Sequence, residues 1–232
     1  MPVQFSGDPL PITNQGERHV AAVLLVDTSG SMSGAPIAEL NQGLVEFGQA
    51  LQEDSLALGR ADVCVISFSS NVETEMSFRS ATEYQAPVLS ANGLTSLNEA
   101  IQAGLDAIEA RKAEYRAEGV SYYRPWLFVL TDGAPTDTER ETETKDRLRN
   151  AIRNKKVVYM PMGIGEGADT AKLQEYYPEE TQAKTVLKAN ASRFKEAFVW
   201  LSQSLGVVSK SDPNVSDSIS LPPTPSIITV GI

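Results

Sequence analysis

Residues 20–31 read Val-Ala-Ala-Val-Leu-Leu-Val-Asp-Thr-Ser-Gly-Ser. The first seven residues are apolar, a pattern typical of a strand that is buried on both faces of a parallel sheet. The chain then places Asp27, Ser29 and Ser31 at alternate positions, so that in an extended segment their oxygens point to one side. Convergent oxygen ligands are what a hard cation such as Mg²⁺ requires. The stretch therefore predicts a central strand that ends in a candidate cation site.

Strands and helices alternate along the rest of the chain. Apolar runs predict further strands at 61–68, 125–130, 157–162 and 185–187, and an alternating return strand at 72–78. Periodic apolar residues predict helices from Pro36 to Leu51, over 97–108 and from Ser192, with a short helix at 171–176 and a charged helix from Thr138 to about Lys156. This order predicts an α/β fold: a doubly wound, mostly parallel central sheet with one antiparallel edge strand and helices on both faces.

Several local features carry expectations of their own. Ser96 with Glu99, and Thr138 with Glu141, fit the spacing of a capping box at a helix start. His19, the only histidine, is expected at the surface just before the first strand. Whether residues 226–230 dock as a strand stays open.

Composition limits the classes of function. The chain has 232 residues and a net charge of −10, which argues against a nucleic-acid footprint and against adhesion to an anionic membrane. The sole cysteine, Cys64, lies in an apolar run and is expected to be a core residue, as suits a reducing compartment. No secretory signal and no stretch of ~20 apolar residues is present. We therefore expect a cytoplasmic protein with an N-terminal arm over 1–18, one domain over 19–207 and a Pro/Ser-rich tail over 208–232.

Two further loops supply oxygen ligands at the same edge of the predicted sheet. In an open parallel sheet, ligands bind beyond the carboxyl ends of the strands, where the strand order reverses. With the usual strand order 3-2-1-4-5-6, Asp132 follows the strand beside residues 20–26, and Thr95 enters the same crevice just before a helix. Asp27, Ser29, Ser31, Thr95 and Asp132 are therefore predicted to meet.

These residues resemble a known site. Asp27-Thr-Ser-Gly-Ser31, Thr95 within Gly93–Ser96 and Asp132 within Thr131–Gly133 are similar to the metal-ion-dependent adhesion site (MIDAS) of von Willebrand factor type A (vWA) domains, and the likeness in motif and element order spans residues 18–206. The resemblance implies that the five residues form a complete MIDAS that holds Mg²⁺, with Mn²⁺ or Ca²⁺ as alternatives. It also implies that a Glu or Asp carboxylate from a partner protein completes the coordination.

A finer resemblance concerns the biological setting. Residues 131–137 and Gly163-Ile-Gly165 are similar to the bacterial tellurium-resistance TerY-like branch of the family. That likeness implies a stress-response or chemical-defence role.

Other functions compete with the binding module. An aspartate and serines after a strand often only form a turn and cap a helix. A metal-dependent enzyme of phosphoryl-transfer or hydrolytic type could use the same site, but the chain lacks a P-loop, and Gly30-Ser-Met-Ser-Gly34 has Met32 where a serine hydrolase has its nucleophile. A structural subunit that assembles through a sheet edge or the tail is a third class. The sequence favours a non-enzymatic binding module and leaves the oligomeric state open.

Overall fold

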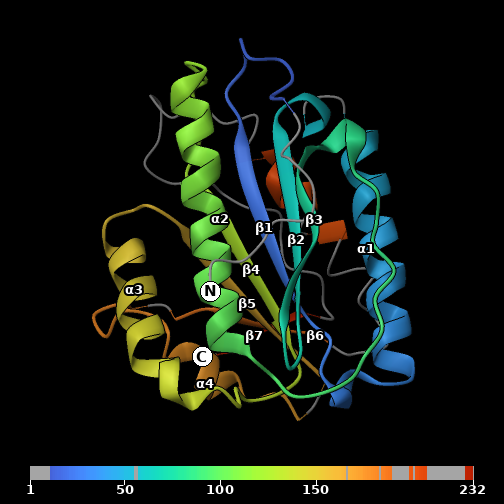
Figure 1. The fold of residues 1–232 in the computed structure, drawn as a ribbon, viewed down its shortest axis with the longest axis vertical. Helices are drawn as coiled ribbons and strands as arrows, with labels where there is room; N and C mark the ends of the chain where they lie inside the picture. The colour runs from blue at the N-terminus through green and yellow to red at the C-terminus, as the bar shows by residue number, and fades with distance from the viewer. Residues whose placement is uncertain are drawn as a thin grey trace.

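The computed structural model describes residues 11–54, 57–165, 167–182, 184–189, 199–200, 202–207 and 228–231. Its centre is a seven-stranded sheet in the order β3-β2-β1-β4-β5-β6-β7 (Figure 1). The strands are β1 Val20–Asp27, β2 Ala61–Phe68, β3 Val72–Ser80, β4 Trp126–Thr131, β5 Val158–Ile164, β6 Val186–Ala189 and β7 Ile228–Gly231. The predicted order around the first strand is confirmed.

The sheet is parallel in the middle and antiparallel at both edges. β2, β1, β4, β5 and β6 run in one direction, and β3 pairs antiparallel with β2 as predicted for the return strand. At the other edge β7 pairs antiparallel with β6, which answers the question that the sequence left open for the end of the chain. The sheet therefore has an antiparallel strand at each edge, where the sequence predicted one.

Helices cover both faces of the sheet (Figure 1). α1 Ala35–Glu53 packs on one face, where it meets Val20, Ala22, Leu24 and Val26 of β1 in one core cluster. α2 Leu97–Ala117, α3 Glu141–Arg153 and α4 Thr170–Gln174 contribute to the second cluster, which contains Ala21, Val23 and Leu25. Because alternate residues of β1 enter different cores, every residue of this strand is buried, as its unbroken apolar sequence predicts.

Helix starts differ from the prediction. α3 begins at Glu141, after a short 3-10 turn, η4 Thr138–Arg140, so the proposed capping box at Thr138 is wrong. Ser96 precedes α2 but makes no capping hydrogen bond with its side chain, so that box is also wrong. The predicted start of the last helix near Ser192 lies outside the described residues, although 199–200 and 202–207 are helical.

His19 is fully buried, contrary to the expected surface position. Its Nδ1 lies 3.0 Å from Oδ2 of Asp62, the second residue of β2. Arg111 Nη2 lies 3.0 Å from the same oxygen, and the Tyr115 hydroxyl donates to it at 2.5 Å. We call His19, Asp62, Arg111 and Tyr115 the amino-end cluster, because it lies where β1 and β2 begin. The prediction failed because the partners of His19 come from segments more than forty residues away.

Other parts of the chain bear on the predicted boundaries. Ile12, in the proposed N-terminal arm, is buried in the α2-side core. Residues 1–10 and 208–227 lie outside the described residues, so the boundaries at 18 and 208 stay predictions. In the part of the chain that the structure describes, no helix is both long and apolar enough to cross a bilayer.

Candidate metal centre

Asp27 is the last residue of β1, and its carboxylate is held in a fixed orientation. The side chain is fully buried. Oδ1 accepts a hydrogen bond from the Ser29 backbone N–H at 2.8 Å, and Oδ2 accepts one from the Thr131 hydroxyl at 2.5 Å. Thr131 ends β4, the strand next to β1, so the hydrogen bond joins the carboxyl ends of two adjacent strands.

The burial of Asp27 has an electrostatic consequence. Desolvation raises the pKa of this carboxyl above its ordinary value, and the negative charge of Asp132 raises it further. The hydrogen bonds from Thr131 and Ser29 lower the pKa but do not cancel the effect of burial. The site therefore contains a buried acid whose charged form the protein alone stabilises only in part.

The two serines connect Asp27 to Asp132. Residues 30–32 form a 3-10 turn, η1 Gly30–Met32, and the fully buried Met32 anchors it in the α1-side core. This turn places the hydroxyls of Ser29 and Ser31 3.0 Å apart. The Ser31 hydroxyl donates to Oδ1 of Asp132 at 2.8 Å. The loop after β1 thus reaches the loop after β4 through side-chain oxygens.

Thr95 approaches from a third loop. Gly93 has a φ of +75°, which favours glycine, and its carbonyl accepts a hydrogen bond from Gly30 N at 3.0 Å. The Thr95 backbone N–H donates to the Thr136 hydroxyl oxygen at 3.1 Å, and the Thr136 N–H donates to the Thr95 carbonyl at 2.9 Å. The Thr95 hydroxyl lies 3.9 Å from the position that a Cβ on Gly133 would occupy, beside Asp132. Thr95 is therefore joined to the Asp132 loop through the backbone and Thr136, rather than through the hydrogen bonds that connect the other four residues.

Asp137 fixes the relation between the last two loops. Its carboxylate accepts hydrogen bonds from the backbone N–H groups of Asn98 at 3.2 Å and Glu99 at 2.8 Å, so it caps α2. The sequence gives no local signal for a cap that comes from 38 residues away.

The five predicted residues differ in exposure. Asp27, Ser29 and Thr95 are buried, whereas Ser31 is exposed and Asp132 is half-buried. Loop residues usually lie at the surface, so the burial of Thr95 shows how closely its loop packs against the other two. Solvent or a partner reaches the site on the side of Ser31 and Asp132.

The ligand chemistry fits a hard cation. Among the residues described, no group of three or more His, Cys, Asp or Glu side chains is placed to hold a metal ion. The candidate site instead combines two carboxylates with three hydroxyls from three loops, an all-oxygen set that suits Mg²⁺ or Mn²⁺ and not a thiolate-preferring ion. Sequence reasoning missed Thr131, whose hydroxyl orients Asp27; its position directly before Asp132 was the available signal.

Solved structures share this fold. The pilus adhesin SpaC from Lactobacillus rhamnosus GG, in its open conformation, aligns with a TM-score of 0.64 and 16% identity over 84% of this chain and 31% of that chain. Proximal thread matrix protein 1 from the mussel byssus, with a zinc-occupied MIDAS motif, aligns with a TM-score of 0.52 and 15% identity over 83% of this chain and 46% of that chain. The ArnB paralog VWA2 from Sulfolobus acidocaldarius aligns with a TM-score of 0.52 and 18% identity over 81% of this chain and 45% of that chain. This chain spans less than half of each of these proteins.

The sequence itself places the chain in a family. No curated protein matches it. The model of the von Willebrand factor type A domain matches residues 22–198, which contain most of β1, all of β2 to β6 and all five candidate ligands. The chain therefore belongs to the von Willebrand factor type A domain family.

Proposed function

We propose that this chain is a metal-ion-dependent protein-binding module, and not an enzyme. Asp27, Ser29, Ser31, Thr95 and Asp132 would hold one Mg²⁺ ion as a complete MIDAS, with Mn²⁺ or Ca²⁺ as alternatives. A Glu or Asp side chain of a partner protein would complete the coordination. The single observation that carries the proposal is the hydrogen bond of 2.8 Å from the Ser31 hydroxyl to Asp132, because it brings candidate ligands 101 residues apart in the chain into direct contact.

The candidate ligands would have different roles at this site. Asp27 accepts hydrogen bonds at both oxygens, so its main part is to orient the Ser29 segment and to supply negative charge. The hydroxyls of Ser29, Ser31 and Thr95 are neutral ligands, so they leave the charge of a bound ion largely uncompensated. A bound divalent ion would supply the positive charge that attracts a partner carboxylate to an acidic protein.

The exposure of the site supports a protein partner. Leu94, next to Thr95, is 61% exposed, so an apolar side chain beside a candidate ligand is available for contact with a partner. Ser31 is exposed as well, so the open side of the site is a surface and not a deep pocket. A zinc-occupied MIDAS in the mussel byssus protein, which has the same fold, supports the proposal of a divalent ion here.

The biological setting is a proposal from sequence likeness. We place the chain in the TerY-like branch, with a role in bacterial tellurium resistance or a related stress response, in the cytoplasm. Residues 131–137, Gly163-Ile-Gly165 and the presence of a single buried cysteine support this setting.

Calorimetric titration with Mg²⁺ and Mn²⁺ tests the metal site. Ser31→Ala and Thr95→Ala each remove one ligand, so we expect affinity to fall about tenfold or more, in line with the loss of a charge-assisted contact. Ser33→Ala is the matched control for Ser31→Ala, because Ser33 is exposed and two residues away. Unchanged affinity in both ligand variants would contradict the assignment.

A capture experiment tests the partner class. Immobilised protein is incubated with candidate partners in Mg²⁺ buffer and in chelator, and bound proteins are identified. The proposal predicts partners that are retained only with Mg²⁺ and lost on Asp-to-Asn or Glu-to-Gln substitution at one position. Turnover of phosphate esters or nucleotides that Asp27→Ala abolishes would instead establish the enzyme class.

A further inference from the structure

A basic residue precedes four neighbouring parallel strands at the end of the sheet opposite the metal site. Arg60, Arg18, Arg124 and Lys156 come one or two residues before β2, β1, β4 and β5, which are adjacent in this order. β4 pairs with β5 through Trp126 and Val158, so Arg124 and Lys156 lie at the same level. With adjacent strands about 4.8 Å apart, the four positions span roughly 15 Å.

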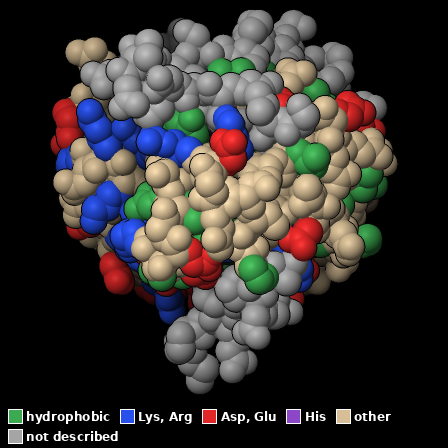
Figure 2. Space-filling model, turned by 90° about the horizontal axis from the view of Figure 1, so that it is seen from above, with side chains coloured by type: hydrophobic (Ala, Val, Ile, Leu, Met, Phe, Trp, Pro, Cys, Tyr) green, Lys and Arg blue, Asp and Glu red, His purple; other side chains and the backbone are tan. Residues whose placement is uncertain are grey.

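Two more cations join this line. Lys155 precedes Lys156, and Arg116 near the end of α2 donates from Nη1 to the Tyr122 hydroxyl at 3.2 Å, two residues before Arg124. Arg60 is set aside because it pairs with Glu17 at 2.7 Å. We call the other five residues the basic row: Arg18, Arg116, Arg124, Lys155 and Lys156. Figure 2 looks onto this end of the molecule and shows Lys and Arg side chains gathered on the side of α2 and α3. Such a gathering is unexpected in a chain with a net charge of −10.

The carboxylates around the basic row form their close ion pairs with other cations. Arg60 pairs with Glu17 at 2.7 Å, Lys112 with Glu109 at 2.8 Å and Arg111 with Glu114 at 2.7 Å. None of the five basic-row residues forms an ion pair with any residue that the structure describes. Arg18 instead lies over the Tyr123 ring, 5.3 Å from its centroid. Glu109 lies near enough to Lys156 and Arg116 for their charges to lower its pKa, but its ion pair is with Lys112. The basic row therefore keeps five cations without an ion-pair partner among the described residues.

Helix dipoles account for only part of the basic row. α2 and α3 end here, and cations near helix carboxyl termini are favourable. That reason covers Arg116, Lys155 and Lys156 but not Arg18 and Arg124, which precede strands. Lys155 also has a φ of +53°, a left-handed conformation that glycine or asparagine adopts at lower cost. The chain therefore has a charged lysine at a position where glycine or asparagine would fit the backbone conformation better.

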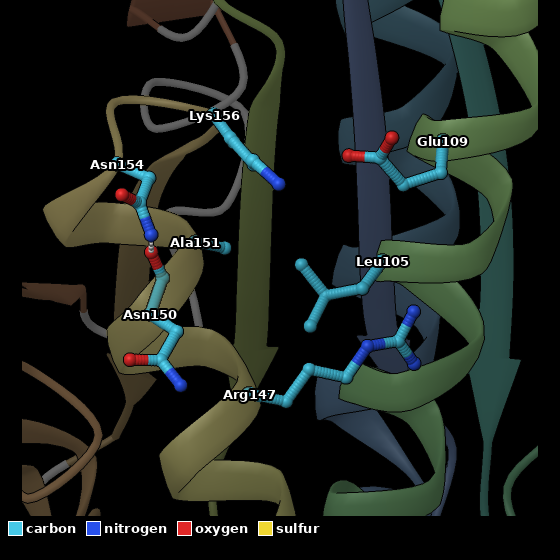
Figure 3. Close-up of a pocket in the computed structure, with 7 residues that line it drawn as sticks. All are labelled: Leu105, Glu109, Arg147, Asn150, Ala151, Asn154 and Lys156. Atoms are coloured by element: carbon cyan, nitrogen blue, oxygen red, sulfur yellow. Dashed lines mark hydrogen bonds between the residues drawn. The ribbon is translucent and has the colours of Figure 1, made fainter.

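A cavity adjoins the basic row (Figure 3). It lies between α2 and α3, has a volume of about 260 Å³ and is lined by Leu105, Glu109, Arg147, Asn150, Ala151, Asn154 and Lys156. Lys156 extends from the α3 side toward Glu109 on α2, with Leu105 below it (Figure 3). The cavity is smaller than the ~300–1,000 Å³ of small-molecule sites, so its size suits a side chain rather than a cofactor.

We propose that the basic row and this cavity form a second interaction surface, which binds an extended acidic segment of a partner protein. From Arg18 before β1 to Lys156 before β5 the basic row crosses two strand spacings, roughly 10 Å, which matches about three residues of extended chain. The unpaired cations along it match Asp and Glu side chains of such a segment. One side chain of the segment enters the cavity beside Leu105. The net charge of −10 opposes the much denser charge of nucleic acid or an anionic membrane more strongly than that of a short peptide. This surface acts without the metal ion, because it lies at the other end of the sheet.

Fluorescence anisotropy with a labelled octapeptide, Glu-Asp-Glu-Leu-Glu-Asp-Glu-Asp, tests the proposal. The full chain is titrated in chelator at low salt, so that the metal site does not contribute. We expect saturable binding that weakens as ionic strength rises. Arg124→Glu with Lys156→Glu should weaken it about tenfold, since each reversal replaces an attraction with a repulsion. Arg140→Glu is the control, because Arg140 is exposed in η4 at the opposite end.

Lys155→Gly separates binding from stability. Glycine relieves the left-handed backbone, so the variant should melt at the same or a higher temperature while it binds the peptide more weakly. Absence of saturable binding, or an equal loss in Arg140→Glu, would overturn the proposal. Tighter binding to an oligothymidine or to phosphatidylserine vesicles than to the peptide would also overturn it, in favour of that other partner.

Discussion

Two buried aspartates at opposite ends of the sheet have opposite environments. Asp27 ends β1 at the carboxyl edge and receives hydrogen bonds from two neutral donors, the Ser29 N–H and the Thr131 hydroxyl. Asp62 lies near the start of β2, and its Oδ2 contacts His19, Arg111 and Tyr115. Both side chains are fully buried. The difference between them is the presence of a cationic side chain.

Their acidities follow from this difference. Burial raises the pKa of both carboxyls, but at Asp62 the hydrogen bond from His19 and the charge of Arg111 outweigh it, so that its pKa is lowered. At Asp27 the effect of burial is larger than that of the hydrogen bonds, so the pKa is raised. The protein compensates the charge of Asp62 with its own cation, whereas the charge of Asp27 has only neutral hydrogen-bond donors. This difference is what we expect if Asp62 has a structural role and Asp27 belongs to the proposed metal site.

The largest expected effect is at Asp62. Asp62→Asn leaves Arg111 buried without a full counter-charge, so we expect the free energy of unfolding to fall by roughly 3 kcal/mol or more. Urea denaturation measures it. Glu114→Gln is the control, because Glu114 is the other partner of Arg111 and its side chain is 32% exposed. This variant should lower the free energy of unfolding by less than about 1 kcal/mol. An equal loss of unfolding free energy in Asp62→Asn and Glu114→Gln would show that the buried contact of Arg111 with Asp62 stabilises the fold no more than its exposed contact with Glu114.

The same residue predicts a pH dependence. Because the pKa of Asp62 is lower in the folded protein than its ordinary value of 3.8, its contribution is fully present above that value and is lost as pH falls through the folded pKa. The stability difference between the wild type and Asp62→Asn should therefore shrink below about pH 3.8. Urea titrations between neutral pH and the acid range measure it. A difference that stays constant through the acid range would contradict the charged state of Asp62.

Tyr115→Phe should have a smaller effect. It removes one hydrogen bond to the Asp62 carboxylate, worth about 1.5 kcal/mol for a charged acceptor, and keeps the ring in place. Tyr122→Phe is the matched control, since Tyr122 stacks on Tyr115 with centroids 5.3 Å apart and lies near the surface. In thermal or urea unfolding, Tyr115→Phe should lose more stability than Tyr122→Phe. A larger loss in Tyr122→Phe would contradict the hydrogen bond from Tyr115 to Asp62.

The smallest change in stability, and the most informative one, is expected at Asp27. Asp27→Asn removes a poorly compensated buried charge while its side chain can still accept from Ser29 N and donate to the Thr131 oxygen. In chelator the variant should be as stable as the wild type, or more stable by about 1 kcal/mol. Added Mg²⁺ should then raise the melting temperature of the wild type only. Equal stabilisation of both proteins by Mg²⁺ would place the ion elsewhere.

The sequence predicted what depends on local pattern. The apolar run before Asp27 determined the central strand, and the periodic apolar residues of α1 and α2 determined the helices on the two faces. The five candidate ligands lie in loops that the strand order alone brings to one edge. The position of Thr131 directly before Asp132 was the only local sign of its role, and nothing local could show that Asp137 caps α2, because both contacts join segments far apart in the chain.

His19 illustrates the same limit at the other end of the sheet. A lone histidine before a strand is expected at the surface unless its partners are known. Its burial depends on Asp62, Arg111 and Tyr115, which β2 and α2 bring to it. The basic row was likewise invisible in a chain of net charge −10, since its members are scattered from residue 18 to residue 156 and meet only in the folded sheet.

Crystals of the protein grown with Mn²⁺ and measured at a wavelength where Mn²⁺ scatters anomalously test the metal centre most directly. The account predicts one strong anomalous peak, in contact with the hydroxyls of Ser29 and Ser31 and beside Thr95 and Asp132. A peak that lies only at other residues, or no peak at saturating Mn²⁺, would contradict it.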